Sequence, residues 1–144
     1  MKILYGEDAR VIAWMRNVLP VDRNAETALG VVRDDGTLIA GFACVRFLER
    51  NAKPVSMEIC VVATRPIWAR PEIMRDLLFY PFVQVGCVRL TSMVAASNRL
   101  ARKTNEKAGF VQEGVIRKGF DGTDDLIVYG MLRNECRWLP KDVP

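Results

Sequence analysis

The segment SNRLARKTNEKAGFVQEG, residues 97–114, carries four cationic side chains between an asparagine and a glycine. Arg99, Lys103 and Lys107 recur every four residues, so they share one face of the helix that we predict over 98–108. Such a face can bind the phosphate groups of a ligand, or it can simply keep the helix soluble. The spacing of the charges alone leaves both interpretations open.

Glu58 is the second candidate for chemistry, because it is the one charged residue in the apolar segment VSMEICVVA over 55–63. Burial among apolar side chains disfavours the charged form of a carboxyl group and so raises its pKa. A carboxyl group with a raised pKa can exchange a proton near neutral pH. A glutamate that faces solvent or pairs with a cation is the alternative. Tyr129, in the last predicted strand, is an alternative proton donor, although a tyrosine in a strand commonly serves packing.

Histidine is absent from the chain, which removes the commonest general base and the commonest transition-metal ligand. Any catalysis would therefore use carboxylates, tyrosine, thiols, backbone amides or water. The four cysteines, Cys44, Cys60, Cys87 and Cys136, are widely spaced and form no CxxC motif. We predict reduced, structural cysteines and no metal site.

The chain has 144 residues, enough for one domain with its own core, and we predict a single domain over 1–144. No apolar run approaches the roughly 20 residues that span a bilayer, and the start MKILYGEDAR does not resemble a signal peptide. These features predict a cytoplasmic protein without a membrane partner. The net charge of +4 favours an anionic partner only weakly. Basic residues are interspersed with acidic ones and no nucleic-acid-binding motif is found, so the sequence argues against a nucleic-acid partner.

Alternating helices and strands are predicted to position these residues. The predicted order is a helix (7–20), a hairpin with its turn at Asp35-Gly36 (28–49), a strand (55–63), a helix (71–86), a strand (88–95), a helix (98–108) and two strands (about 111–119 and 125–132). Asp8 is the predicted N-cap of the first helix and Pro20 its end, Pro81 should kink or shorten the second, and Gly109 should cap the third. Strand–helix–strand units need parallel strands and the hairpins need antiparallel ones, so a mixed α/β sheet with helices on both faces is predicted.

This order of elements, together with a set of short motifs, resembles the GCN5-related N-acetyltransferase (GNAT) superfamily, and within it the type that acetylates ribosomal-protein N-termini. The matching motifs are Tyr80-Pro81-Phe82, Val88-Arg89-Leu90, Asn98, Glu106-Lys107-Ala108-Gly109-Phe110 and Glu113-Gly114. They cover about residues 57–132. The resemblance implies a mostly antiparallel sheet with one splayed parallel pair of strands, and small diverged members of this kind are expected in bacteriophages.

The resemblance also implies transfer of an acetyl group from acetyl-CoA to a primary amine on a small molecule or a peptide. The pantetheine arm would lie between the strands at 55–63 and 88–95, against the backbone of Cys60, Val61, Val62 and Ala63. Asn98 matches an asparagine that contacts this arm. Arg102 and Lys103 lie on a helix that would run beside the phosphates.

Two parts of the chain depart from the pattern of the family. Arg65 matches an arginine before a glycine-rich turn, but the three glycine positions hold Pro66, Trp68 and Arg70. Proline lacks an N–H, and bulky side chains limit access to the backbone. Either Arg65 and Arg70 bind the phosphates through their side chains, or CoA binding is lost.

The second departure is Asn105, which occupies the position of a tyrosine that acts as general acid in many relatives. An amide cannot supply a proton, although the ribosomal-protein type often lacks this tyrosine too. The departures leave a second interpretation open, a catalytically inactive GNAT-fold protein with a binding or structural role. A homodimer is also left open.

Overall fold

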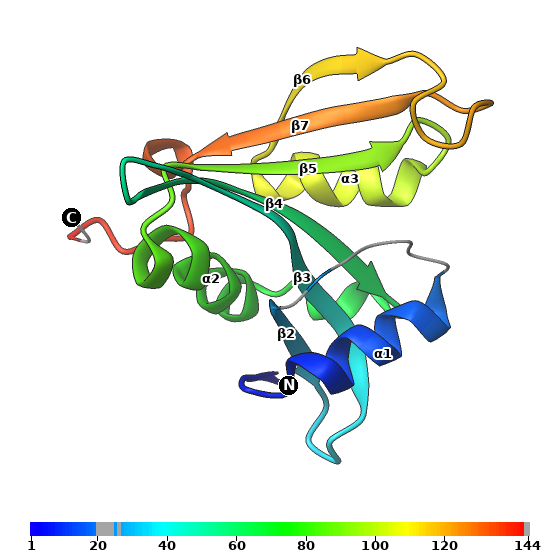
Figure 1. The fold of residues 1–144 in the computed structure, drawn as a ribbon. Helices are drawn as coiled ribbons and strands as arrows, with labels where there is room; N and C mark the ends of the chain where they lie inside the picture. Colours follow the sequence, from blue (N-terminus) through cyan, green and yellow to red (C-terminus); the bar gives the residue numbers. More distant parts are fainter. Residues whose placement is uncertain (20–24, 26, 143–144) are drawn as a thin grey trace.

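The strands form one mixed sheet in the order β1-β2-β3-β4-β5-β7-β6 (Figure 1). The structure is a computed structural model, and it describes residues 1–19, 25 and 27–142. The strands are β1 (Lys2–Leu4), β2 (Thr27–Val32), β3 (Leu38–Arg50), β4 (Lys53–Ala63), β5 (Arg89–Ala95), β6 (Val111–Ile116) and β7 (Leu126–Leu132). Neighbouring strands are antiparallel except for the parallel pair β4–β5. This arrangement confirms the predicted fold class.

Helices cover both faces of the sheet. They are α1 (Asp8–Val18), α2 (Pro71–Phe79) and α3 (Arg99–Ala108), with short 3-10 turns at Pro66–Trp68 and Arg133–Glu135 and a π-helical turn at Tyr80–Val85. Helix α1 packs against β2 and β3, whereas α3 packs against β5 and β6 on the opposite face. Figure 1 shows α1 at one end of the sheet and α3 at the other, with β4 running between them.

Strand β4 is apolar over most of its length because it is covered on both faces. Successive side chains of a strand point to opposite faces. Ile59 belongs to the core cluster that holds Leu77 and Leu78 of α2, whereas Val62 packs with Val11 of α1. The sheet therefore has two cores, and β4 contributes to both.

Pro81 shortens the second helix as predicted. Helix α2 ends at Phe79, and the chain continues as the π-helical turn Tyr80–Val85. A proline inside a helix removes one backbone donor and clashes with the preceding turn, so the regular pattern cannot continue there. Gly86 ends the turn with a φ of +92°, and Phe82 stays fully buried in the core.

The prediction for the start of the first helix was wrong. Glu7, not Asp8, is the N-cap of α1, and no side chain caps this helix end. The Asp8 carboxylate instead accepts a hydrogen bond from the Ala28 N–H at 2.8 Å, which ties the helix to β2. The helix ends at Val18, and Pro20, its predicted end, lies outside the described residues.

The remaining boundaries follow local geometry. Gly109 caps α3 with a φ of +106°, as predicted. β6 ends at Ile116 instead of residue 119, because Lys118 takes up a φ of +53° in the turn that follows. The sequence analysis missed β1, which has three residues, too few to show an alternating pattern.

Leu77→Ala should destabilise the fold, because the Leu77 side chain is 1% exposed in the core between α2 and the sheet. We expect a loss of about 2–5 kcal/mol in the free energy of unfolding, measured by urea denaturation. Leu100→Ala is the matched control, since Leu100 is 67% exposed on α3. An equal loss in the two variants would contradict the packing described for α2.

Candidate functional site

The two parallel strands separate partway along their length. The β4–β5 register ends at the pair Ile59–Ser92, although β4 continues to Ala63 and β5 to Ala95. Figure 1 shows the ends of the two strands pointing apart. The sheet therefore opens into a V at its centre.

The open edge of β4 presents backbone groups. The Val55 carbonyl accepts a hydrogen bond from Val88 N–H at 2.9 Å, so Val55 faces the β5 side of β4. Peptide groups alternate between the two edges of a strand, so Val61 and Ala63 also face this side. In the described part of the chain, no strand pairs with β4 there beyond Ile59. These peptide groups are available to a ligand that carries its own amides.

A cavity of about 210 Å³ fills the V. Its walls come from the end of β4, from α2 and from α3, and apolar side chains such as Phe42, Leu78 and Phe110 dominate them. Ser92 and Asn105 are among its polar lining residues. The cavity suits a narrow, mostly apolar chain with a few polar groups.

The loop after β4, residues 65–70, is closed by hydrogen bonds between its own backbone groups. Ala69 N–H donates to the Pro66 carbonyl at 3.4 Å, and Arg70 N–H donates to the Trp68 carbonyl at 2.9 Å. Pro66 has no N–H to offer. Pro66, Ala69 and Arg70 therefore offer no free N–H, unlike the residues of a glycine-rich turn that binds phosphate.

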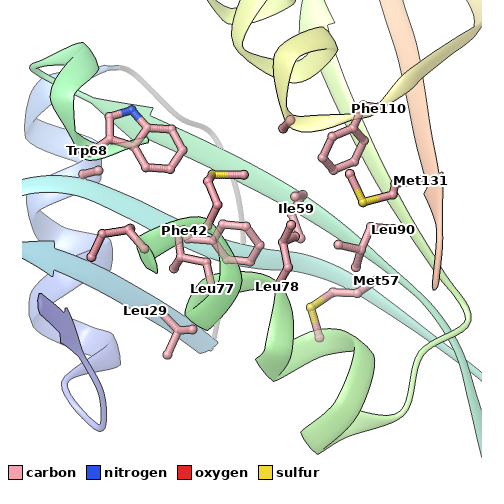
Figure 2. Packing of buried hydrophobic residues seen from close by; sticks show 14 of the residues in the cluster. Leu29, Phe42, Met57, Ile59, Trp68, Leu77, Leu78, Leu90, Phe110 and Met131 are labelled. Carbon is pink, nitrogen blue, oxygen red and sulfur yellow. The ribbon is translucent and has the colours of Figure 1, made fainter. Parts of the chain in front are cut away.

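Trp68 explains the shape of this loop. Its side chain is 6% exposed and lies at one end of the apolar core, near Phe42 and Leu77 (Figure 2). It therefore anchors the loop to the sheet and also lines the cavity. Arg65 lines the cavity as well, and Arg65 and Arg70 are both exposed. Two exposed cationic side chains, Arg65 and Arg70, thus flank this loop.

Two asparagines line the cavity from the α3 side, Asn98 at the N-cap of the helix and Asn105 within it. Asn98 caps the helix, since its Oδ1 accepts a hydrogen bond from Ala101 N–H at 3.1 Å. Asn105 Nδ2 donates to Ser92 Oγ at 3.2 Å, which connects α3 to β5. The sequence analysis missed Ser92, although a serine between the apolar Leu90 and Val94 on one face of β5 was a usable signal.

Tyr129 and Arg102 form a contact under α3. Arg102 Nε donates to the Tyr129 hydroxyl at 3.2 Å, and this hydroxyl donates to Glu106 Oε1 at 3.2 Å. The other Arg102 nitrogens donate to the Ala96 carbonyl and to Gln112 Oε1. Tyr129 is fully buried. The structure thus uses both residues to hold α3 on the sheet, and neither lines the cavity.

Glu58 lies on the other face of β4. It is 8% exposed, and its register partners are Arg46 of β3 and Thr91 of β5. Because side chains alternate, Glu58 shares its face with Cys60 and not with Ile59, which faces α2. A ligand in the V would have the apolar cavity on one side of the sheet and Glu58 on the other.

Of the other predicted ligand contacts, Cys60, Val61, Val62 and Ala63 line the cavity together. Lys103 is exposed on α3 and is not among the lining residues.

All four cysteines are free thiols. Burial raises the pKa of Cys87 to about 11. Burial, and secondarily the charge of Glu58, also raises the pKa of Cys44. A thiol with a raised pKa holds little thiolate near neutral pH, so neither cysteine is suited to act as a nucleophile. Among the described residues, no group of three or more side chains could hold a metal ion.

Two motif residues meet on the Glu58 side of the sheet. Arg89 forms a bidentate ion pair with Glu113, with Nη1 at 3.0 Å from Oε2, and its Nε donates to Thr91 Oγ1. The Arg89 guanidinium lowers the pKa of Glu113. The pair crosses β7 at Gly130, where a Cβ would overlap the Glu113 carboxylate. Arg89 and Glu113 belong to two different sequence motifs, and the ion pair between them gives both residues a structural role.

Gly130→Ala should displace the flexible Glu113 carboxylate from Arg89 and destabilise the fold by about 0.5–1 kcal/mol, the contribution of a partly exposed ion pair. Thermal or urea unfolding measures this loss. Gly114→Ala is the matched control on the neighbouring strand, since a Cβ there meets nothing within 4 Å. If the two glycine variants were equally stable, the close approach at Gly130 would be refuted.

Comparison with solved structures places the fold. A chimera of the spermidine N-acetyltransferase SpeG from Vibrio cholerae with hSSAT is 18% identical, with a TM-score of 0.72 over 93% of this chain and 98% of that chain. A GNAT-family acetyltransferase from Streptococcus pneumoniae is 15% identical, with a TM-score of 0.69 over 91% and 98%. A GNAT-family acetyltransferase from Bacillus anthracis is 19% identical, with a TM-score of 0.58 over 75% and 67%.

These similarities show that the chain has the fold of GNAT acetyltransferases. At such identities they show the fold alone. No protein-family model matches the chain, and no curated protein matches it. None of the helices in the described part of the chain combines the length and apolar character needed to cross a bilayer.

Proposed function

We propose that this chain is a single-domain N-acetyltransferase that moves an acetyl group from acetyl-CoA to a primary amine. The observation that carries the proposal is the open edge of β4 at Val61 and Ala63, beside an apolar cavity between two diverging parallel strands. The fold it shares with GNAT acetyltransferases supports the same function.

The pantetheine arm of acetyl-CoA fits this cleft. The arm is a narrow chain with two amide groups, and the peptide groups of Val61 and Ala63 offer matching partners. Cys60, Val62 and Asn98 also line the cavity. Backbone N–H groups here would polarise the acyl carbonyl, because the strand fixes them in place before the reaction.

The pyrophosphate would be held by side chains. Arg65 lines the mouth of the cavity, and Arg70 precedes the first turn of α2. A guanidinium binds phosphate through paired, charge-assisted hydrogen bonds. Lys103 on α3 is a further candidate for this role, whereas Arg102 is already held by its bonds under α3.

Acetyl-CoA supplies an activated thioester, and the chain must accept the proton that the amine loses. Glu58 is the proposed base, acting directly or through water. It lies on the face of β4 opposite the α2 side of the cavity, so the amine would approach from the α1 side. Protein N-termini are the acceptors that the motif resemblance favours, and the neighbour named a spermidine acetyltransferase adds polyamines as candidates.

Arg65→Ala should weaken binding of acetyl-CoA about tenfold, because it removes a charge-assisted phosphate contact. It should leave the affinity for S-acetylpantetheine, which lacks the pyrophosphate, unchanged. Isothermal titration calorimetry measures both affinities. Arg75→Ala is the matched control, since Arg75 lies on the exposed face of α2 and pairs with Asp76. A parallel loss of affinity for both ligands would argue against phosphate binding by Arg65.

Glu58→Gln should lower turnover on the order of a hundredfold, because it removes a general base while keeping the side-chain shape. CoA release is followed with a panel of peptides with free N-termini and of polyamines. Affinity for acetyl-CoA should stay the same. Glu49→Gln, at an exposed position of β3, is the control. Unchanged turnover in Glu58→Gln would remove Glu58 as the base.

A second candidate function is a catalytically inactive protein that keeps the GNAT fold for binding or structure. The closed loop over residues 65–70 favours it, since two of its amides are satisfied internally. The titrations separate the two candidates. If wild-type protein does not bind acetyl-CoA at millimolar concentration, the acetyltransferase is excluded and the inactive protein is favoured.

A further inference from the structure

Ser92 occupies a particular place in the cleft. It is the last residue of β5 that pairs with β4, so it lies at the point where the strands separate. Its side chain lines the cavity and is 5% exposed. A hydroxyl at this position can reach a ligand that enters the V.

The direction of the hydrogen bond on Ser92 leaves its hydrogen available. Asn105 Nδ2 donates to Ser92 Oγ at 3.2 Å, so the serine oxygen is the acceptor in that bond. A serine hydroxyl also has one hydrogen to donate. Within the described ranges, no acceptor takes the Ser92 hydrogen. Because Ser92 lines the cavity, it can donate this hydrogen to a ligand there that accepts a hydrogen bond.

Asn105 is itself held firmly. Its carbonyl accepts a hydrogen bond from Phe110 N–H at 2.9 Å where α3 ends. The next residue, Glu106, accepts from the buried Tyr129 hydroxyl, which also binds Arg102. These contacts fix the helix α3 on β5 and β7, and the Asn105 side chain on this helix reaches Ser92. Asn105 thus joins the helix to the residue that lines the cleft.

We propose that the Ser92 hydroxyl donates a hydrogen bond to the sulfur of the acyl donor, and that Asn105 is the positioning residue that orients this hydroxyl. The inference rests on the proposed function. In acyl transfer a C–N bond forms and the C–S bond breaks, with its electron pair left on sulfur. The amine proton passes to the base, and Ser92 keeps its own proton while its hydrogen bond stabilises the sulfur anion. A serine and an asparagine would thus compensate for the absent tyrosine.

The test is the titration of the CoA thiol while it is bound, because this readout needs no acceptor amine. The thiolate is followed by its ultraviolet absorbance across a pH series, with desulfo-CoA complexes as the reference that removes the protein's own titration. Ser92→Ala should lower the thiolate fraction of bound CoA about tenfold at fixed pH, since one hydrogen bond to an anion is lost. Asn105→Leu should produce a smaller change in the same direction.

Thr104→Val is the matched control. Thr104 lines the same cavity, but its hydroxyl already donates to the Leu100 carbonyl at 2.9 Å. Its loss should leave the thiol titration unchanged. If Ser92→Ala and wild-type protein bind CoA equally and titrate alike, the role of Ser92 is overturned while the proposed function stands. If wild-type protein binds no CoA at all, both are overturned.

Discussion

The separation of β4 from β5 beyond the pair Ile59–Ser92 is the constraint on which the rest of the structure depends. Separating two strands exposes peptide groups in the middle of a sheet, which is costly unless water or a ligand pairs with them. The fold holds the strands apart from both sides of the opening. Trp68 and α2 pack along β4, and the buried hydrogen bonds of Tyr129 fix α3 along β5 and β7.

Much of the fold could be predicted from the sequence because it depends on local patterns. The apolar run over 55–63 indicated a covered strand, Pro81 indicated a shortened helix, and Gly109 indicated a left-handed cap. Asp8 does not cap the helix because its carboxylate accepts a hydrogen bond from the Ala28 N–H in β2. A short polar side chain next to a helix start can bond in several directions, and only packing selects one.

The candidate site was predictable to a smaller extent. Cys60 to Ala63 and Asn98 were placed in the cleft by resemblance, and they line the cavity, while their contacts with a ligand stay predictions. Tyr129 and Arg102 were also expected at the site. They instead form hydrogen bonds between α3 and β7, and contacts between distant elements cannot be read from the sequence. The contact of Asn105 with Ser92 joins residues from α3 and β5, which no spacing along the chain could reveal.

Hydrogen exchange at β4 tests the central claim most directly, because the claim concerns individual peptide groups. The amides of Val61 and Ala63 face the open edge, whereas that of Thr64 donates to the Ile39 carbonyl at 2.9 Å and serves as an internal reference. We predict that saturating acetyl-CoA slows exchange at Val61 and Ala63, measured by NMR, and leaves Thr64 nearly unchanged. Unchanged exchange at Val61 and Ala63 in the presence of bound acetyl-CoA would contradict the account.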